Sequence, residues 1–106
     1  MKTALGSRVA FMKTEDRNRK NAWKAQQRQE AQSAFPLSNV LLESLFQSVE
    51  TRVENEGCDH TYRFTSGWLS DHQLASTPVL DWLAEHGGFC DCEVVANARD
   101  HWEQNK

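Results

Sequence analysis

Two short cysteine and histidine pairs constrain the fold of this chain more than any other feature. The first pair is Cys58-x-His60 and the second is Cys90-x-Cys92. In an extended strand, residues i and i+2 point to the same face, so each pair can present two metal-binding side chains on one side. If two such strands lie side by side, facing side chains come within about 4.5–5.5 Å of each other. The spacing therefore predicts one tetrahedral Zn²⁺ held by Cys58, His60, Cys90 and Cys92.

Other interpretations of the same residues stay open. Three cysteines cannot close a complete set of disulfides, and the chain opens with no export signal, so reduced thiols in a cytoplasmic protein are expected. The thiols could then be small buried side chains, or Cys90 and Cys92 could form a redox dithiol. His72 and His86 are reserve ligands, although histidines of this kind are more typical of solvent-facing helix positions.

The small size of the chain favours an additional stabilising element such as a bound metal ion. Its 106 residues suit one small domain, and only 39% of them are apolar, although four are Trp and five are Phe. The mean hydropathy is -0.71, so the core is thin. A structural zinc, with apparent binding energies of about 10–16 kcal/mol in finger peptides, would offset that weakness.

Charge divides the chain into two parts. Residues 1–34 carry eight Lys and Arg against three Asp and Glu, whereas the rest carries four against twelve. Phe35-Pro36 follows this change, and the residue before a proline is biased away from helix. We therefore expect a basic helical arm at 1–34, a zinc-stapled domain at 35–98, and a polar tail or last helical turn at 99–106.

The arm has the composition of a helix from about residue 14 to residue 32, without Gly or Pro. Trp23 is its only large apolar residue, so the arm has little to bury. Five basic side chains fall on one face at the helical period. Such a stripe is typical of a solvated face, of a nucleic-acid contact, or of a contact with an acidic protein or with the chain's own acidic domain. The candidate partner-binding residues are Lys13, Arg17, Lys20, Lys24 and Arg28.

The domain should begin with a core helix over 38–54, where apolar residues recur every three or four positions after a possible Ser38 N-cap. Short helices are expected to start at Thr65 and at Thr77. Strands are expected over 61–64 and 92–96 because both contain β-favouring residues. The pattern predicts an α+β fold, a small single domain in which the core helix and two short helices pack on a two-stranded antiparallel ribbon.

An enzyme is the alternative class. A zinc-dependent hydrolase or deaminase would need an open metal position and a general base, for which Asp91 and Glu93 are the adjacent carboxylates. Four candidate ligands leave no open position, and the sequence has no His-Glu-x-x-His or Pro-Cys-x-x-Cys motif. The sequence thus favours a non-enzymatic binding or regulatory module. Large aromatic residues near the proposed site are expected in the core, with base stacking as the alternative: Trp68, Trp82 and Phe89.

Several motifs together resemble a known family. They are Phe35-Pro36-Leu37-Ser38, Leu45-Phe46, Gly57-Cys58-Asp59-His60-Thr61, and Gly87-Gly88-Phe89-Cys90-Asp91-Cys92-Glu93-Val94 with Asn97 following. Over about residues 35–98 the chain resembles the small bacterial proteins catalogued as Domain of Unknown Function 2695. The resemblance implies a cytoplasmic bacterial domain and carries no activity. No stretch approaches the roughly 18–20 apolar residues of a membrane span, so no membrane contact is expected.

Overall fold

The computed structural model describes residues 19–106, and the chain divides into two units between Ser33 and Ala34. In the first unit, residues 19–33 form a helix whose side chains are almost all exposed. Near its end the Ser33 hydroxyl donates a hydrogen bond of 2.7 Å to the Glu30 carbonyl. The expected start of this helix, at residues 14–18, lies outside the described residues.

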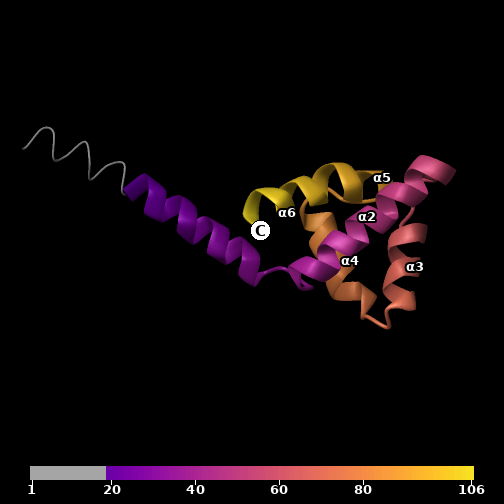
Figure 1. Cartoon of the computed structure of the whole chain (residues 1–106), viewed down its shortest axis with the longest axis horizontal. Helices are drawn as coiled ribbons and strands as arrows, with labels where there is room; N and C mark the ends of the chain where they lie inside the picture. Colours follow the sequence, from indigo (N-terminus) through magenta and orange to yellow (C-terminus); the bar gives the residue numbers. More distant parts are fainter. Residues whose placement is uncertain (1–18) are drawn as a thin grey trace, which may run out of the picture. The chain divides into compact units, whose positions relative to one another are not determined.

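The second unit is built from helical elements joined by short loops (Figure 1). Among residues 19–106, none of the helices combines the length and apolarity needed to cross a bilayer. The elements of this unit are α2 (Asn39–Glu56), α3 (Arg63–Asp71), α4 (Ser76–Glu85), α5 (Asp91–Glu93), the π-helix η1 (Val94–Ala98) and α6 (Arg99–Asn105).

The expected core helix is present as α2. Ser38 is its N-cap, and the Ser38 hydroxyl accepts a hydrogen bond of 3.3 Å from the Leu41 amide. At the other end Gly57 has a φ of 77°, a backbone conformation that favours glycine, and its amide donates to the Val53 carbonyl. The face predicted by the apolar spacing is buried, with four residues wholly inside the core: Leu42, Leu45, Phe46 and Val49.

The expected α+β fold is wrong, because the part of the chain described here contains no strand. Residues 61–64 are a turn followed by the start of α3, and residues 92–96 are helical. The β-branched Val94 has no exposed surface and belongs to the same buried cluster as the α2 core residues. Burial against α2 therefore outweighs the β preference of this segment, since that preference depends strongly on context.

The last residues are part of the core and not only a polar tail. Trp102 of α6 is 2% exposed, and its ring lies 5.4 Å from that of Phe46, centroid to centroid. Its indole N–H donates a hydrogen bond of 3.0 Å to the Asn39 side chain at the start of α2. Arg99 adds an ion pair of 2.5 Å with Glu50. These contacts fix α6 along α2.

Candidate metal centre

The three cysteines come together from two distant parts of the sequence. Cys58 lies in the loop between α2 and α3, Cys90 immediately precedes α5, and Cys92 lies within α5. Their sulfur atoms are all within 4.8 Å of one another, and those of Cys90 and Cys92 are 3.3 Å apart. The three sulfurs of the predicted four-ligand set therefore lie close together, but a loop and a helix start bring them there in place of paired strands.

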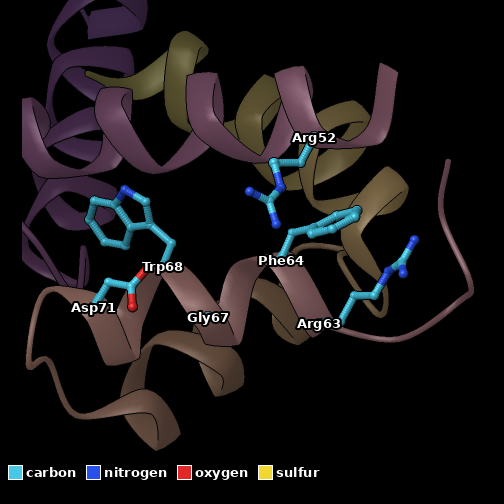
Figure 2. A pocket seen from close by; sticks show the side chains of 6 residues that line it. All are labelled: Arg52, Arg63, Phe64, Gly67, Trp68 and Asp71. Carbon is cyan, nitrogen blue, oxygen red and sulfur yellow. The ribbon is translucent and has the colours of Figure 1, made fainter. Parts of the chain in front are cut away.

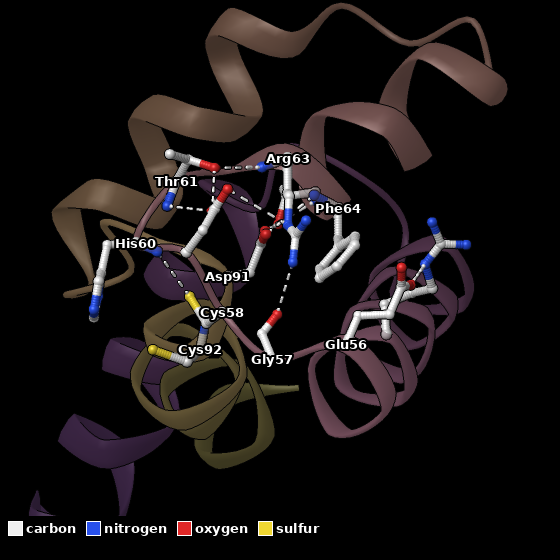
Figure 3. Close-up of polar contacts among 12 residues, drawn as sticks. Glu56, Gly57, Cys58, His60, Thr61, Arg63, Phe64, Asp91 and Cys92 are labelled. Atoms are coloured by element: carbon white, nitrogen blue, oxygen red, sulfur yellow. Dashed lines mark hydrogen bonds and ion pairs between the residues drawn. The ribbon is translucent and has the colours of Figure 1, made fainter.

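Backbone amides of both segments donate hydrogen bonds at the cluster, and two of these bonds join the segments. The Asp91 amide donates to the Thr61 carbonyl over 3.0 Å. The amides of His60 and Cys92 both point at the Cys58 sulfur, at 3.3 and 3.4 Å (Figure 3). Two donors on one sulfur stabilise negative charge there, which suits a thiolate metal ligand.

The thiols differ in their ionisation. Burial alone would raise the pKa of Cys58, but hydrogen bonds from the Cys92 and His60 amides and from the neighbouring thiols outweigh it, so this pKa lies below its ordinary value. Burial instead raises the pKa of Cys90 to about 12, and Cys90 is only 3% exposed. A bound cation would compensate the buried charge, since metal ligation deprotonates a coordinating thiol.

His60, the fourth predicted ligand, lies in the same loop but is not part of the sulfur cluster. His60 is exposed and has a φ of 67°. A His residue tolerates this backbone conformation better than a β-branched residue does. The preceding Asp59 carboxylate supports the turn by accepting a hydrogen bond of 3.1 Å from the Thr61 amide. In Figure 3 the imidazole projects from the loop, while the His60 amide faces Cys58.

Asp91, between the two cysteines, has a role that the sequence did not reveal. Its side chain is fully buried and accepts hydrogen bonds from the Phe64 amide (3.0 Å), the Thr65 amide (3.0 Å) and the Thr65 hydroxyl (2.8 Å). These amides belong to the first turn of α3, whose own N-cap, Tyr62, provides no side-chain acceptor. Asp91 therefore caps α3 from a distant segment, and both of its oxygens are occupied. The sequence placed the start of this helix at Thr65, where the threonine itself would be the cap, so it did not indicate a distant partner; in the structure α3 begins at Arg63.

The other candidate carboxylate and histidines have different neighbours. Glu93 accepts a contact of 3.4 Å from the Cys90 thiol. His72 stacks on Trp68 at 3.9 Å between ring centroids, and His86 stacks on His101 at 3.6 Å. Neither His72 nor His86 belongs to the sulfur cluster.

The aromatic residues singled out in the sequence separate into two groups. Trp68 and Trp82 are 7% and 4% exposed and lie in the buried cluster. Phe89, immediately before Cys90, is 62% exposed. The core interpretation is thus correct for the two tryptophans, while Phe89 is a surface residue.

A pocket lies between α2 and α3 (Figure 2). The guanidinium carbons of Arg52 and Arg63 lie 5.1 and 4.3 Å from the centre of the Phe64 ring. Each arginine also pairs with a carboxylate, Arg52 with Glu56 at 2.9 Å and Arg63 with Asp59 at 3.6 Å. The two positive charges are therefore matched within the chain. The residues that line the pocket are Arg52, Arg63, Phe64, Gly67, Trp68 and Asp71.

Part of the predicted basic stripe falls in the described helix over 19–33. Lys20, Lys24 and Arg28 are exposed and follow one another at four-residue spacing, which places them on one helical face. Trp23 beside them is 61% exposed. Lys13 and Arg17 lie outside the described residues.

The fold and the sulfur cluster define a small helical domain with a three-cysteine site that could hold a metal ion. The family model described as protein of unknown function (DUF2695) matches residues 45–97, which include all three cysteines and Asp91. The chain is similar to the uncharacterized protein Rv2271 of Mycobacterium tuberculosis and to the uncharacterized protein Mb2294 of Mycobacterium bovis. Each is 32% identical over 78 residues, covering 74% of this chain and 79% of the relative. The chain belongs to this family. No solved structure gives a significant match.

Proposed function

We propose that this chain is a zinc-stabilised binding module in which Cys58, Cys90 and Cys92 hold one Zn²⁺ and His60 supplies the fourth ligand. The observation that supports it is the approach of three sulfur atoms to within 4.8 Å. Three thiolates and one imidazole form a closed tetrahedral set that suits structural zinc. His60 follows Cys58 by two residues, and the proposal requires its imidazole to turn toward the sulfurs.

The role of such a metal follows from the segments that it would join. Cys58 belongs to the loop that leads into α3, whereas Cys90 and Cys92 begin the helical segment 91–105. Hydrogen bonds already join these segments: the Asp91 amide donates to the Thr61 carbonyl, the Cys92 amide to the Cys58 sulfur, and the first turn of α3 to the Asp91 carboxylate. A metal would add a strong link there and support the thin core.

Metal analysis with matched variants tests this proposal. We expect about one zinc per chain and a lower melting temperature after removal of zinc by a strong chelator. Cys58→Ser and Cys92→Ser should lose the zinc, and His60→Ala should weaken its binding. His72→Gln is the matched control, because His72 stacks on Trp68, and it should retain one zinc. Protein without zinc, or with a melting temperature indifferent to the chelator, would contradict the proposal.

The same site can be tested for catalysis. A hydrolase or deaminase would need an open metal position and Glu93 or Asp91 as base. Asp91 is already held by three hydrogen bonds at the start of α3, which disfavours it in that role. Cobalt substitution distinguishes the two classes, since the absorption spectrum of an open site should change when a small anion such as azide is added. A closed site should show no change.

We further propose that the arm contacts an anionic partner, and we favour nucleic acid. Lys20, Lys24 and Arg28 form an exposed row on a helix with few apolar residues, and the acidic domain would repel phosphates elsewhere. Five phosphate contacts, with Lys13 and Arg17 included, predict a log–log salt slope of about -4.5 on duplex DNA.

Anisotropy of a labelled DNA duplex measures that slope. The triple variant Lys20→Gln, Lys24→Gln, Arg28→Gln should bind more weakly and reduce the slope by about 3. Arg19→Gln, on the opposite side of the same helix, is the control and should change the affinity for DNA and the salt slope much less. If no binding occurs even at low salt, the nucleic-acid proposal is wrong, and an acidic protein partner becomes the version to test.

A further inference from the structure

We propose that Cys58 and Cys92 form a disulfide when the protein reacts with a hydroperoxide, and that this reaction expels the metal. The thiol chemistry rests on the arrangement of the three sulfurs, and only the metal release rests on the proposed zinc site. The sulfur cluster would then be an oxidative modification site as well as a staple.

Exposure separates the three thiols. Cys90 is 3% exposed, whereas Cys58 and Cys92 are both partly accessible to solvent. A small oxidant therefore reaches Cys58 and Cys92 more easily than Cys90. Exposure is one of the conditions that select cysteines for oxidation.

The geometry favours Cys58 as the first sulfur to react. It accepts hydrogen bonds from the amides of His60 and Cys92, and these donors stabilise the thiolate that attacks a peroxide. Cys90 instead faces the Glu93 carboxylate at 3.4 Å, which opposes negative charge on its sulfur.

The geometry also supplies Cys92 as the second sulfur. Its backbone nitrogen lies 3.4 Å from the Cys58 sulfur, and the two sulfurs are no more than 4.8 Å apart. A disulfide requires about 2.05 Å between sulfurs and usually about 3.5–4.5 Å between Cβ atoms. Rotation of two partly exposed side chains can close a gap of this size.

The reaction balances without any further reagent. The Cys58 thiolate attacks one peroxide oxygen, the O–O bond breaks, and a sulfenic acid forms while hydroxide leaves and takes up a proton to become water. The Cys92 thiolate then attacks the Cys58 sulfur, the S–O bond breaks, and the second oxygen leaves as water after protonation. Two thiolates are oxidised by two electrons in total, and hydrogen peroxide is reduced to two waters. Cys90 and His60 alone are too few ligands to retain zinc.

Hydrogen peroxide treatment of the full chain tests the inference, with zinc-loaded and chelator-treated protein in parallel. We expect both forms to lose two hydrogen atoms by intact mass, and peptide mapping should place the bond between Cys58 and Cys92. Zinc should appear in solution, measured with a chromogenic chelator, at the rate of disulfide formation. Dimedone should trap the intermediate on Cys58.

Two variants sharpen the assignment. Cys92→Ser should stop at a Cys58 sulfenic acid, while Cys90→Ser should still form the disulfide. Because either substitution could weaken the fold, peptide mapping of the unaltered chain decides which two cysteines form the disulfide. A Cys90–Cys92 bond, or three reduced cysteines after treatment, would overturn the inference.

The outcomes also separate this inference from the proposed zinc site. A chain that binds zinc but forms no disulfide refutes only the oxidation. A chain that binds no zinc but joins Cys58 to Cys92 in the metal-free form refutes only the zinc proposal.

Discussion

At the residue scale, Asp91 connects the sulfur cluster to the start of α3. Replacing Asp91 with Ala would leave the Phe64 amide, the Thr65 amide and the Thr65 hydroxyl without their acceptor in a buried setting. We expect a loss of about 2–4 kcal/mol in the free energy of unfolding, because buried donors without partners are costly. Urea denaturation measures the change. Glu93→Gln, at a neighbouring carboxylate outside this cap, is the control and should cost much less.

Replacing Gly88 and replacing Gly67 with alanine should have opposite effects on the stability of the domain. A Cβ at Gly88 would lie 3.1 Å from the Leu83 carbonyl oxygen and 3.2 Å from the Val94 Cα, so Gly88→Ala should destabilise the domain by about 1–3 kcal/mol. A Cβ at Gly67, within α3, meets no atom within 4 Å. Gly67→Ala should therefore stabilise the domain by up to about 1 kcal/mol through helix propensity. Thermal unfolding of the two variants tests this expectation. If both variants had a higher melting temperature than the unaltered chain, or both a lower one, the expectation would be wrong.

Single residues also show what the sequence could reveal of the candidate site. The i, i+2 spacing identified Cys58, Cys90 and Cys92, although the paired strands from which it was argued are not present. Cys90 does have an extended backbone, and Cys92 follows in the first turn of α5. Spacing could not place the His60 ring, whose direction depends on a backbone with φ of 67°. It also could not find the role of Asp91, since its partners in α3 lie 26 and 27 positions away.

At the element scale, local preference identified α2 but failed for residues 92–96. The buried face of α2 repeats at the helical period, so sequence and packing agree there. The segment 92–96 is short and contains two β-branched residues, Val94 and Val95. Its helical conformation follows from the burial of Val94 and from its continuation into α6. The π-helix η1 (Val94–Ala98) overlaps this segment and continues beyond it, and its Asn97 donates a hydrogen bond of 3.0 Å to the Gly87 carbonyl. Such insertions have no clear signal in a single sequence.

The contact between α4 and α6 predicts a dependence of stability on pH. His101 of α6 stacks on His86 at the end of α4, and burial followed by the charge of His86 lowers the His101 pKa, while Asp100 opposes the shift. The folded state then binds fewer protons than the unfolded state, so this stabilisation is full above the unfolded pKa of about 6.5. It should be lost as the pH falls through the lowered folded value.

Thermal unfolding from about pH 7.5 to pH 5, with a chelator present throughout, measures this contribution without competition between protons and zinc. The midpoint should fall with acid. His101→Gln should unfold at a lower temperature than the unaltered chain at neutral pH but show a flatter pH dependence. An equal pH dependence in the two proteins would show that His101 is not responsible.

At the scale of the whole molecule, the charge of the chain changes sign near residue 34, but composition did not predict its fold class correctly. The change from basic to acidic composition lies beside the boundary between Ser33 and Ala34. Composition could not show that the second unit has helices and no strand, since that depends on how its segments share one core. That core includes Trp102, in a stretch whose neighbours are polar.

The same division predicts that the acidic unit folds without the arm. Among residues 19–106, the buried cluster and the partly buried residues packed on it run from Phe35 to Trp102. Deleting residues 1–33 should therefore shift the melting temperature by no more than about 2 °C, a few tenths of a kcal/mol for a domain of this size. Zinc content should be unchanged and DNA binding lost. A large fall in melting temperature would show that the arm packs on the acidic domain of its own chain, and dissociation of a dimer on deletion would assign that contact to a second copy.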